Sequence, residues 1–191
     1  IRKPASFAGA QPAEIRVLHF PSDRSLGKVV ICEPVAEAPL EGFFYWIRGE
    51  QWHYWADARG DVMVPVDQWI GLRIERQEAW SDLSALRNLG PEDLYLLGIR
   101  GSHTGGAKPG DACMQHIAHL SGLRVLDLSQ TDVTGVGMRW VGGLQGLRRL
   151  TAPDRMDNAG LAHVVKLPAL TGLYLREGRV TDAGLRHLAG L

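Results

Sequence analysis

The sequence predicts an α/β fold in which a stack of repeated strand–helix units follows a small β-rich domain. Two observations predict the stack. An L-x-x-L-x-L spacing recurs with its first leucines at Leu123, Leu147 and Leu170, and a helix-like segment follows each copy. The β-rich domain is indicated by the tryptophans, since five of the six precede residue 81. Because one such unit cannot bury its own apolar face, neighbouring units must share a continuous core.

The composition is typical of a globular protein of one or two domains, with 191 residues, 45% hydrophobic and 22% charged. Lys plus Arg equals Asp plus Glu at 21 each, so no bulk charge favours nucleic acid as a partner. No apolar run approaches the roughly 20 residues of a membrane span. No signal peptide is recognised either. The chain begins with Ile1, so we expect a processed or partial chain whose true N-terminus is missing.

The two cysteines, Cys32 and Cys113, do not form a disulfide framework of the kind found in small secreted proteins. We expect two buried, small apolar side chains. Free thiols favour a reducing compartment, which is the only indication of a cytoplasmic location that the sequence offers.

The N-terminal part has the pattern of short strands separated by turns. Residues 1–13 are interpreted as a tail or linker, and residues 14–80 as a β-rich, sandwich-like domain. The predicted strands are 15–20, 28–32, 43–47, 52–55, 62–64 and 69–74.

Residues 81–93 are predicted to form a helical segment that caps the repeats. Ser81-Asp82 is typical of a helix start, and Leu83, Leu86 and Leu89 follow at helical spacing. The first repeat needs such a cover because terminal repeats otherwise expose an apolar face.

The leucine-rich repeats are predicted over residues 94–191 as four units: 94–122, 123–146, 147–169 and a truncated 170–191. The first unit is the longest, because it contains a glycine-rich loop at 101–110. Where the fourth unit ends, either the chain stops within the solenoid, or the next strand position is covered by a partner or by self-association with another copy.

The second half of each unit also repeats. Residues 180–188 (VTDAGLRHL) align with residues 156–164 and with residues 133–141. Thr181 and Asp157 are predicted to cap the helices that follow them. A glycine three residues after each of these caps, Gly184 or Gly160, lets the helix approach the strand closely.

The V-T-D-A-G-L-x-x-L motif of residues 180–188 and the sequence G-L-R-V-L-D-L-S-Q-T of residues 122–131 resemble a known family. They are similar to bacterial, planctomycete-like leucine-rich repeat proteins with helical convex sides, the type related to cysteine-containing repeats. The resemblance covers about residues 94–191 and implies a leucine-rich-repeat solenoid of short strands and convex helices.

The outward, concave face of the predicted strands is the candidate binding surface. Alternation along a strand sends the third, fifth and seventh positions of each repeat to that face. Tyrosine and arginine at these positions are types enriched at interface hot spots. The alternative is an ordinary solvated sheet surface. The candidate partner-binding residues are Arg100, Asp127, Arg149, Thr151, Tyr174 and Arg176.

Three histidines, His116, His163 and His187, occupy one repeat position and suggest a metal site. Packed helices lie about 8–10 Å apart, whereas Zn–N bonds are roughly 2.0–2.1 Å. We therefore interpret the column as repeat packing, and predict no metal site and no cofactor.

Two further motifs have simple structural explanations. Arg59-Gly60-Asp61 matches a cell-adhesion tripeptide but is predicted to be a turn. The loop at 101–110 lacks the order of a phosphate-binding loop, so we interpret it as an insertion, with a partner contact as the alternative. No catalytic motif is recognised, so no catalytic residue is predicted.

The sequence predicts a non-enzymatic module that binds a protein partner, without nucleic acid and without a membrane span. One alternative is a carbohydrate- or ligand-binding β-domain carried on the repeats, with Trp46, Trp52, Tyr54 and Trp55 as its aromatic platform. Another is the sensing fragment of a larger enzyme.

Overall fold

The computed structural model describes residues 14–34, 52–75, 77–101, 107–176 and 179–190. Within these residues the strands are β1 (Ile15–His19), β2 (Lys28–Cys32), β3 (His53–Asp57), β4 (Asp61–Pro65), β5 (Trp69–Ile74), β6 (Leu96–Ile99), β7 (Val125–Asp127), β8 (Arg149–Thr151) and β9 (Gly172–Tyr174). The helices are α2 (Gln77–Trp80), α3 (Gly135–Val141), α4 (Asn158–Val164) and α5 (Asp182–Leu185), with 3-10 segments η1 (Ser84–Asn88), η2 (Asp111–His116) and η3 (Arg186–Gly190).

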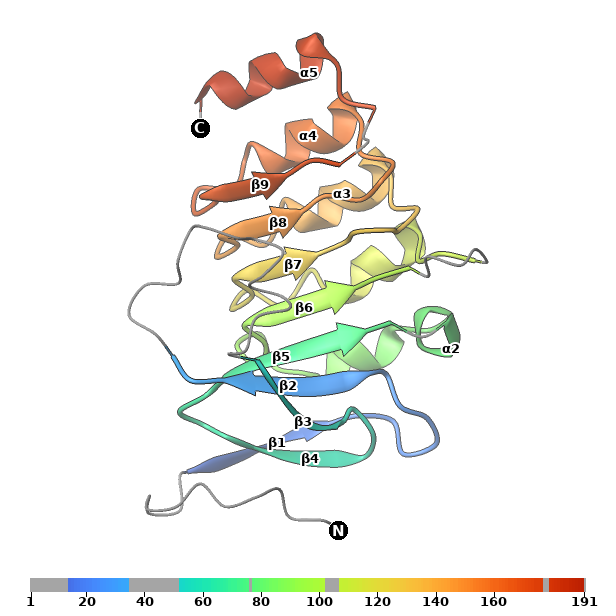
Figure 1. Cartoon of the computed structure of the whole chain (residues 1–191), viewed down its shortest axis with the longest axis vertical. Coiled ribbons are helices and arrows are strands. Elements are labelled where there is room, and N and C mark those ends of the chain that lie inside the picture. Colours follow the sequence, from blue (N-terminus) through green and yellow to red (C-terminus); the bar gives the residue numbers. More distant parts are fainter. Residues whose placement is uncertain (1–13, 35–51, 76, 102–106, 177–178, 191) are drawn as a thin grey trace.

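A seven-stranded sheet runs along the molecule in the order β3-β2-β5-β6-β7-β8-β9 (Figure 1). Strand β2 is antiparallel to β3 and β5, and the strands from β5 to β9 are parallel. Strands β1 and β4 form a separate antiparallel pair. The protein is therefore a mixed α/β structure with a parallel sheet through its C-terminal half.

The leucine register aligns the parallel strands. Their central leucines pair as neighbours, so that one row of the sheet faces the helices. The row consists of Leu72, Leu97, Leu126, Leu150 and Leu173. This register is fixed because a shift by one residue would turn every leucine to the opposite face.

Strand β5 behaves as a repeat strand, although the sequence analysis places it at the end of the β-rich domain. Gly71 pairs with Leu96 and Leu72 with Leu97 in the register that the later repeats continue. Trp69 thereby takes the place of a first leucine, 25 residues before Leu94. The division of the chain into domains stays a prediction, and the sheet crosses the predicted boundary without a break.

The helices lie behind the sheet and cover one of its faces (Figure 1). Helix α3 packs between η2 and α4, and α4 packs against α5. The Thr134 hydroxyl accepts a hydrogen bond from Val136 N, and Asp157 Oδ1 accepts one from Gly160 N at 2.8 Å. Such caps satisfy amides that have no partner within the helix, so each short helix begins at a defined residue.

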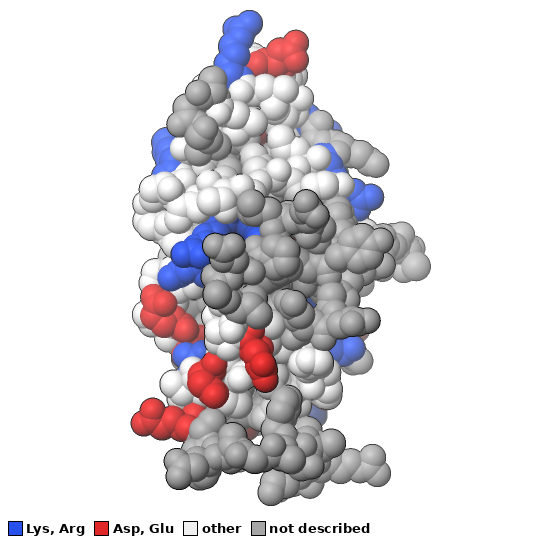
Figure 2. Space-filling model, turned by 60° about the vertical axis from the view of Figure 1, so that its left-hand side comes forward, with Lys and Arg blue, Asp and Glu red and all other residues white. Residues whose placement is uncertain are grey.

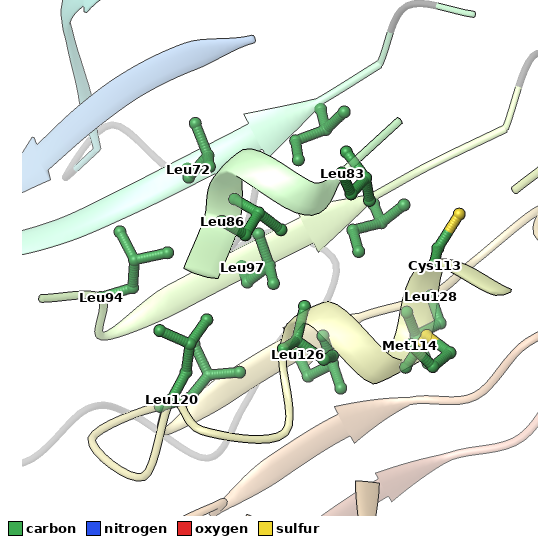
Figure 3. Packing of buried hydrophobic residues seen from close by; sticks show 14 of the residues in the cluster. Leu72, Leu83, Leu86, Leu94, Leu97, Cys113, Met114, Leu120, Leu126 and Leu128 are labelled. Atoms are coloured by element: carbon green, nitrogen blue, oxygen red, sulfur yellow. The ribbon is translucent and has the colours of Figure 1, made fainter. Parts of the chain in front are cut away.

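A continuous hydrophobic core joins the two halves of the chain between the sheet and the helices, from Leu18 to Leu167. Figure 3 shows its central part, where leucines of β5, β6 and β7 lie near Leu86 of η1 and near Cys113 and Met114 of η2. Leu83, Leu86 and Leu89 are buried there. The predicted strand at 43–47 lies outside the described residues.

Candidate functional site

The outward face of the sheet, opposite the helices, carries the predicted binding residues. Asp127, Thr151 and Tyr174 are paired neighbours and form one row across β7, β8 and β9. Arg149 lies two residues earlier along β8. Arg100 follows β6 and Arg176 follows β9. The parallel register therefore brings three of the six residues into direct neighbourhood and places the other three around them.

Arg100 reaches across the sheet to the next repeat. Its Nε lies 3.3 Å from Asp127 Oδ2 and donates a hydrogen bond to Ser129 Oγ at 3.0 Å. Asp127 Oδ1 also accepts from Ser129 N at 2.9 Å. The Asp127 carboxylate is thus held by groups of its own chain, which fixes the charge pattern in the middle of this face.

Three of the predicted residues are buried, although strand alternation alone predicts exposure. Asp127 is 2%, Thr151 1% and Arg149 7% exposed, while Tyr174 is half-buried. Within the described part of the chain, Thr151 Oγ1 is a buried atom with no hydrogen-bond partner. Buried hydroxyls normally have a hydrogen-bond partner, and at 1% exposure Thr151 presents almost no surface to another molecule.

A second group of residues, missed by the sequence analysis, lies where the chain enters the strands. We define this entry rim as Tyr95, Arg124 and Arg148, together with Trp69. Arg124 N donates to Tyr95 O and Arg148 N donates to Arg124 O, both at 2.9 Å, so the first three are lateral neighbours. Trp69 stacks on Tyr95 with ring centroids 4.1 Å apart. The sequence pattern could have revealed this neighbourhood, because Tyr95, Arg124 and Arg148 each occupy the second position of the leucine motif.

The arginines of the rim affect the Tyr95 phenol. Burial raises the pKa of Tyr95, and the positive charges of Arg148, Arg149 and Arg124 oppose that rise. Figure 2 turns the strand-entry side forward and shows Lys and Arg side chains gathered at mid-height, above a group of acidic ones.

A shallow groove lies on the convex side between α3 and α4. It is lined by Thr134, Gly135, Val136, Arg139, Asp157, Ala159 and His163. Gly135 packs closely against the start of α4, since a Cβ there would lie 2.8 Å from Asp157 Oδ1 and 3.0 Å from Gly160 N. The walls are open and lack a catalytic arrangement.

The three histidines lie on the convex side in η2, α4 and η3, and α3 with Trp140 lies between η2 and α4. The described residues contain no group of three or more His, Cys, Asp or Glu side chains that could hold a metal ion. Burial lowers the pKa of His116, with the Arg87 charge adding to the effect and Asp82 opposing it.

The remaining sequence motifs have local structural roles. Gly60, at φ 63°, turns the chain between β3 and β4, and its neighbour Arg59 donates to Ser22 O at 2.8 Å. Cys32 and Cys113 are free and buried, and burial raises the pKa of each thiol. Residues 102–106 of the glycine-rich loop lie outside the described residues.

The aromatic residues of the N-terminal part do not share one environment. Trp55 donates its indole N–H to Met63 O at 2.8 Å, whereas the neighbouring Tyr54 is 58% exposed. Trp52 lies near Tyr95, with ring centroids 6.5 Å apart. Trp46 lies outside the described residues. The pairing of β3 with β2 is irregular at Trp55, because Val29 pairs with Ala56 and Val30 with Tyr54.

In the part of the chain that the structure describes, no helix has the length and apolar character needed to cross a membrane. No family model and no curated protein matches the sequence. Among solved structures, the chain is similar to an internalin, inlF, from Listeria monocytogenes, with a TM-score of 0.44 and 24% identity. The match covers 58% of this chain and 29% of the internalin.

Proposed function

We propose that this protein is a non-enzymatic interaction module, a short leucine-rich-repeat solenoid that binds a protein partner through the outward face of its parallel sheet. The described helices all cover the opposite face of the repeat strands. Repeat stacks of this kind present extended surfaces suited to macromolecular partners. We also propose that the protein is a bacterial, planctomycete-like leucine-rich-repeat protein.

The observation that carries the proposal is the composition of the outward row. Asp127, Thr151 and Tyr174 lie side by side. The row combines a carboxylate, a hydroxyl without a partner and an aromatic ring. Asp127 and Thr151 are buried, so the partly exposed Tyr174, a residue type enriched at interface hot spots, is the part of the row that a partner can reach. The alternative is self-association, in which β9, the edge strand of the sheet, pairs with a second copy of the chain.

The test is capture of a partner with the full chain as bait, identification by mass spectrometry and titration with the purified partner. The double variant Arg149→Ala, Tyr174→Ala should raise Kd at least about tenfold, since hot-spot truncations cost roughly 2 kcal/mol or more. The control, Val136→Ala, changes an exposed residue of the convex side and should leave Kd unchanged. Equal affinity of wild type and double variant would exclude the outward face.

A further inference from the structure

The β1–β4 ribbon, at the opposite end of the molecule from α5, has an apolar outer side (Figure 1). Val17 pairs with Met63 and Ile15 pairs with Pro65, so these side chains share one side of the ribbon. Ile15 is 61%, Val17 42% and Met63 61% exposed. An antiparallel strand pair that packs on a core normally presents polar residues to water. This ribbon instead presents aliphatic side chains and a thioether.

The inner side of the ribbon is anchored to the core. Leu18, Val62 and Val64 alternate with the exposed residues and belong to the buried cluster, with at most 6% exposure. Arg16 Nη2 also donates to Asp93 O at 3.0 Å, which ties β1 to the segment before β6. A chemical change confined to the outer side of the ribbon therefore leaves these contacts intact.

The four methionines of the chain all lie in the described residues and differ sharply in accessibility. Met114, Met138 and Met156 are 0% exposed in the core of the repeats, whereas Met63 is 61% exposed. An oxidant must contact the sulfur to react with it. The three buried methionines therefore become reactive only when the repeats open locally.

The two thiols do not offer an easier target on the surface. Cys32 is 2% and Cys113 8% exposed. Burial also raises the pKa of both thiols, which disfavours the reactive thiolate. Among the six sulfur atoms of the chain, the thioether of Met63 is thus the one that a dissolved oxidant meets first.

We propose that Met63 is a reversible oxidation site that controls the polarity of the outer side of the β1–β4 ribbon. Hydrogen peroxide transfers one oxygen atom to Met63 Sδ. The O–O bond breaks as the S–O bond forms, and the second oxygen takes up the proton of the first and leaves as water. The sulfur is oxidised by two electrons and the peroxide is reduced by two. The sulfoxide places a polar group beside Val17, and a methionine sulfoxide reductase restores the thioether.

The test treats the full chain with hydrogen peroxide at about pH 5, where thiols are protonated, and follows each methionine by peptide mass spectrometry. Met63 should form the sulfoxide at least about tenfold faster than each buried methionine. The oxidised protein should elute earlier in hydrophobic-interaction chromatography with an unchanged circular dichroism spectrum. Methionine sulfoxide reductase with a thiol reductant should restore the original elution.

Met63→Leu should elute at one position before and after peroxide, because leucine keeps the apolar volume and removes the sulfur. Met156→Leu is the matched control and should shift on oxidation as wild type does. Equal oxidation rates at Met63 and the buried methionines would overturn the proposal, as would oxidation of Met63 without a change in elution. A shift that persists in Met63→Leu would assign the change to another residue and would overturn it too. None of these outcomes bears on the outward face of the parallel sheet, so the proposed function is tested separately.

Discussion

At the scale of single residues, the first and third repeats each fix the start of the helix in the next repeat. Asp111 Oδ1 accepts hydrogen bonds from Thr134 N at 2.7 Å and Gly137 N at 3.0 Å, while Oδ2 accepts one from the Thr134 hydroxyl. Asn158, at the same repeat position, bonds both the N–H and the hydroxyl of Thr181. A side-chain oxygen of one unit thus fixes where the following helix begins.

This contact predicts unequal effects of two substitutions. Asp111→Ala should lower the free energy of unfolding by about 1–2 kcal/mol, because it removes a helix cap and leaves amides unsatisfied. Asp111→Asn should lose much less, since Asn158 performs the same role with a carboxamide. Urea unfolding followed by circular dichroism measures both. If the alanine and asparagine variants were equally unstable, the cross-unit cap would contribute nothing beyond the charge.

Sequence reasoning predicts part of this cap and misses the rest. The cap at Asp157 follows from residue type and position alone, whereas Thr181 occupies the N-cap position of α5 without a capping hydrogen bond from its side chain. The cross-unit bonds of Asp111 and Asn158 span 23 residues or more and depend on how the units stack. Likewise, alternation places Asp127 on the outward face but does not reveal that Arg100 crosses to it.

At the scale of elements, Asp82 ties the segment before η1 to the β1–β2 loop. Its Oδ1 accepts from Ser84 N at 2.9 Å, and its Oδ2 lies 2.6 Å from Arg24 Nη2. Hydrogen bonds from Ser84, and then from Arg24, lower the pKa of Asp82 to about 2. The unfolded chain has an aspartate pKa of about 3.9, so the ionised form stabilises the folded state.

The stabilisation by Asp82 should be complete above about pH 4 and should fade as the pH falls towards 2. Asp82→Asn should therefore be less stable than wild type at neutral pH, with a difference that shrinks through this range. The side chain is half exposed, so the effect is small and best seen as a difference in Tm against pH. Asp67→Asn, at an exposed turn residue, is the control. A constant difference from pH 7 to 2 would contradict this role of Asp82.

The element that links the two parts of the chain is β5. Its tryptophan at a leucine position and its aromatic surroundings favour the β-rich part of the chain. In the structure β5 pairs on both sides, antiparallel with β2 and parallel with β6. A side-chain pattern defines a strand, whereas the choice of neighbour depends on which edge is available for pairing.

At the scale of the whole molecule, the repeats are not equally protected. Leu97, Leu126 and Leu150 are fully buried in successive strands, while Leu173 of β9 is only partly buried. Leu185 is 45% exposed, although its equivalents Met114, Met138 and Leu161 are completely buried. Stability in a repeat stack is the sum of unit and interface terms, so a unit with one interface is the weakest.

We therefore predict a gradient of amide protection in this chain. Amides of β9 and α5 should exchange with solvent faster than those of β6 and β7, because unit four can open without breaking the remaining core. Hydrogen exchange followed by mass spectrometry, comparing peptides from residues 170–176 and 123–129, measures the difference. Binding of a partner across β8 and β9 should slow exchange in the fourth unit most, since ordering that unit is coupled to binding. Equal protection of both peptides in the free chain would mean that the stack opens only as a whole.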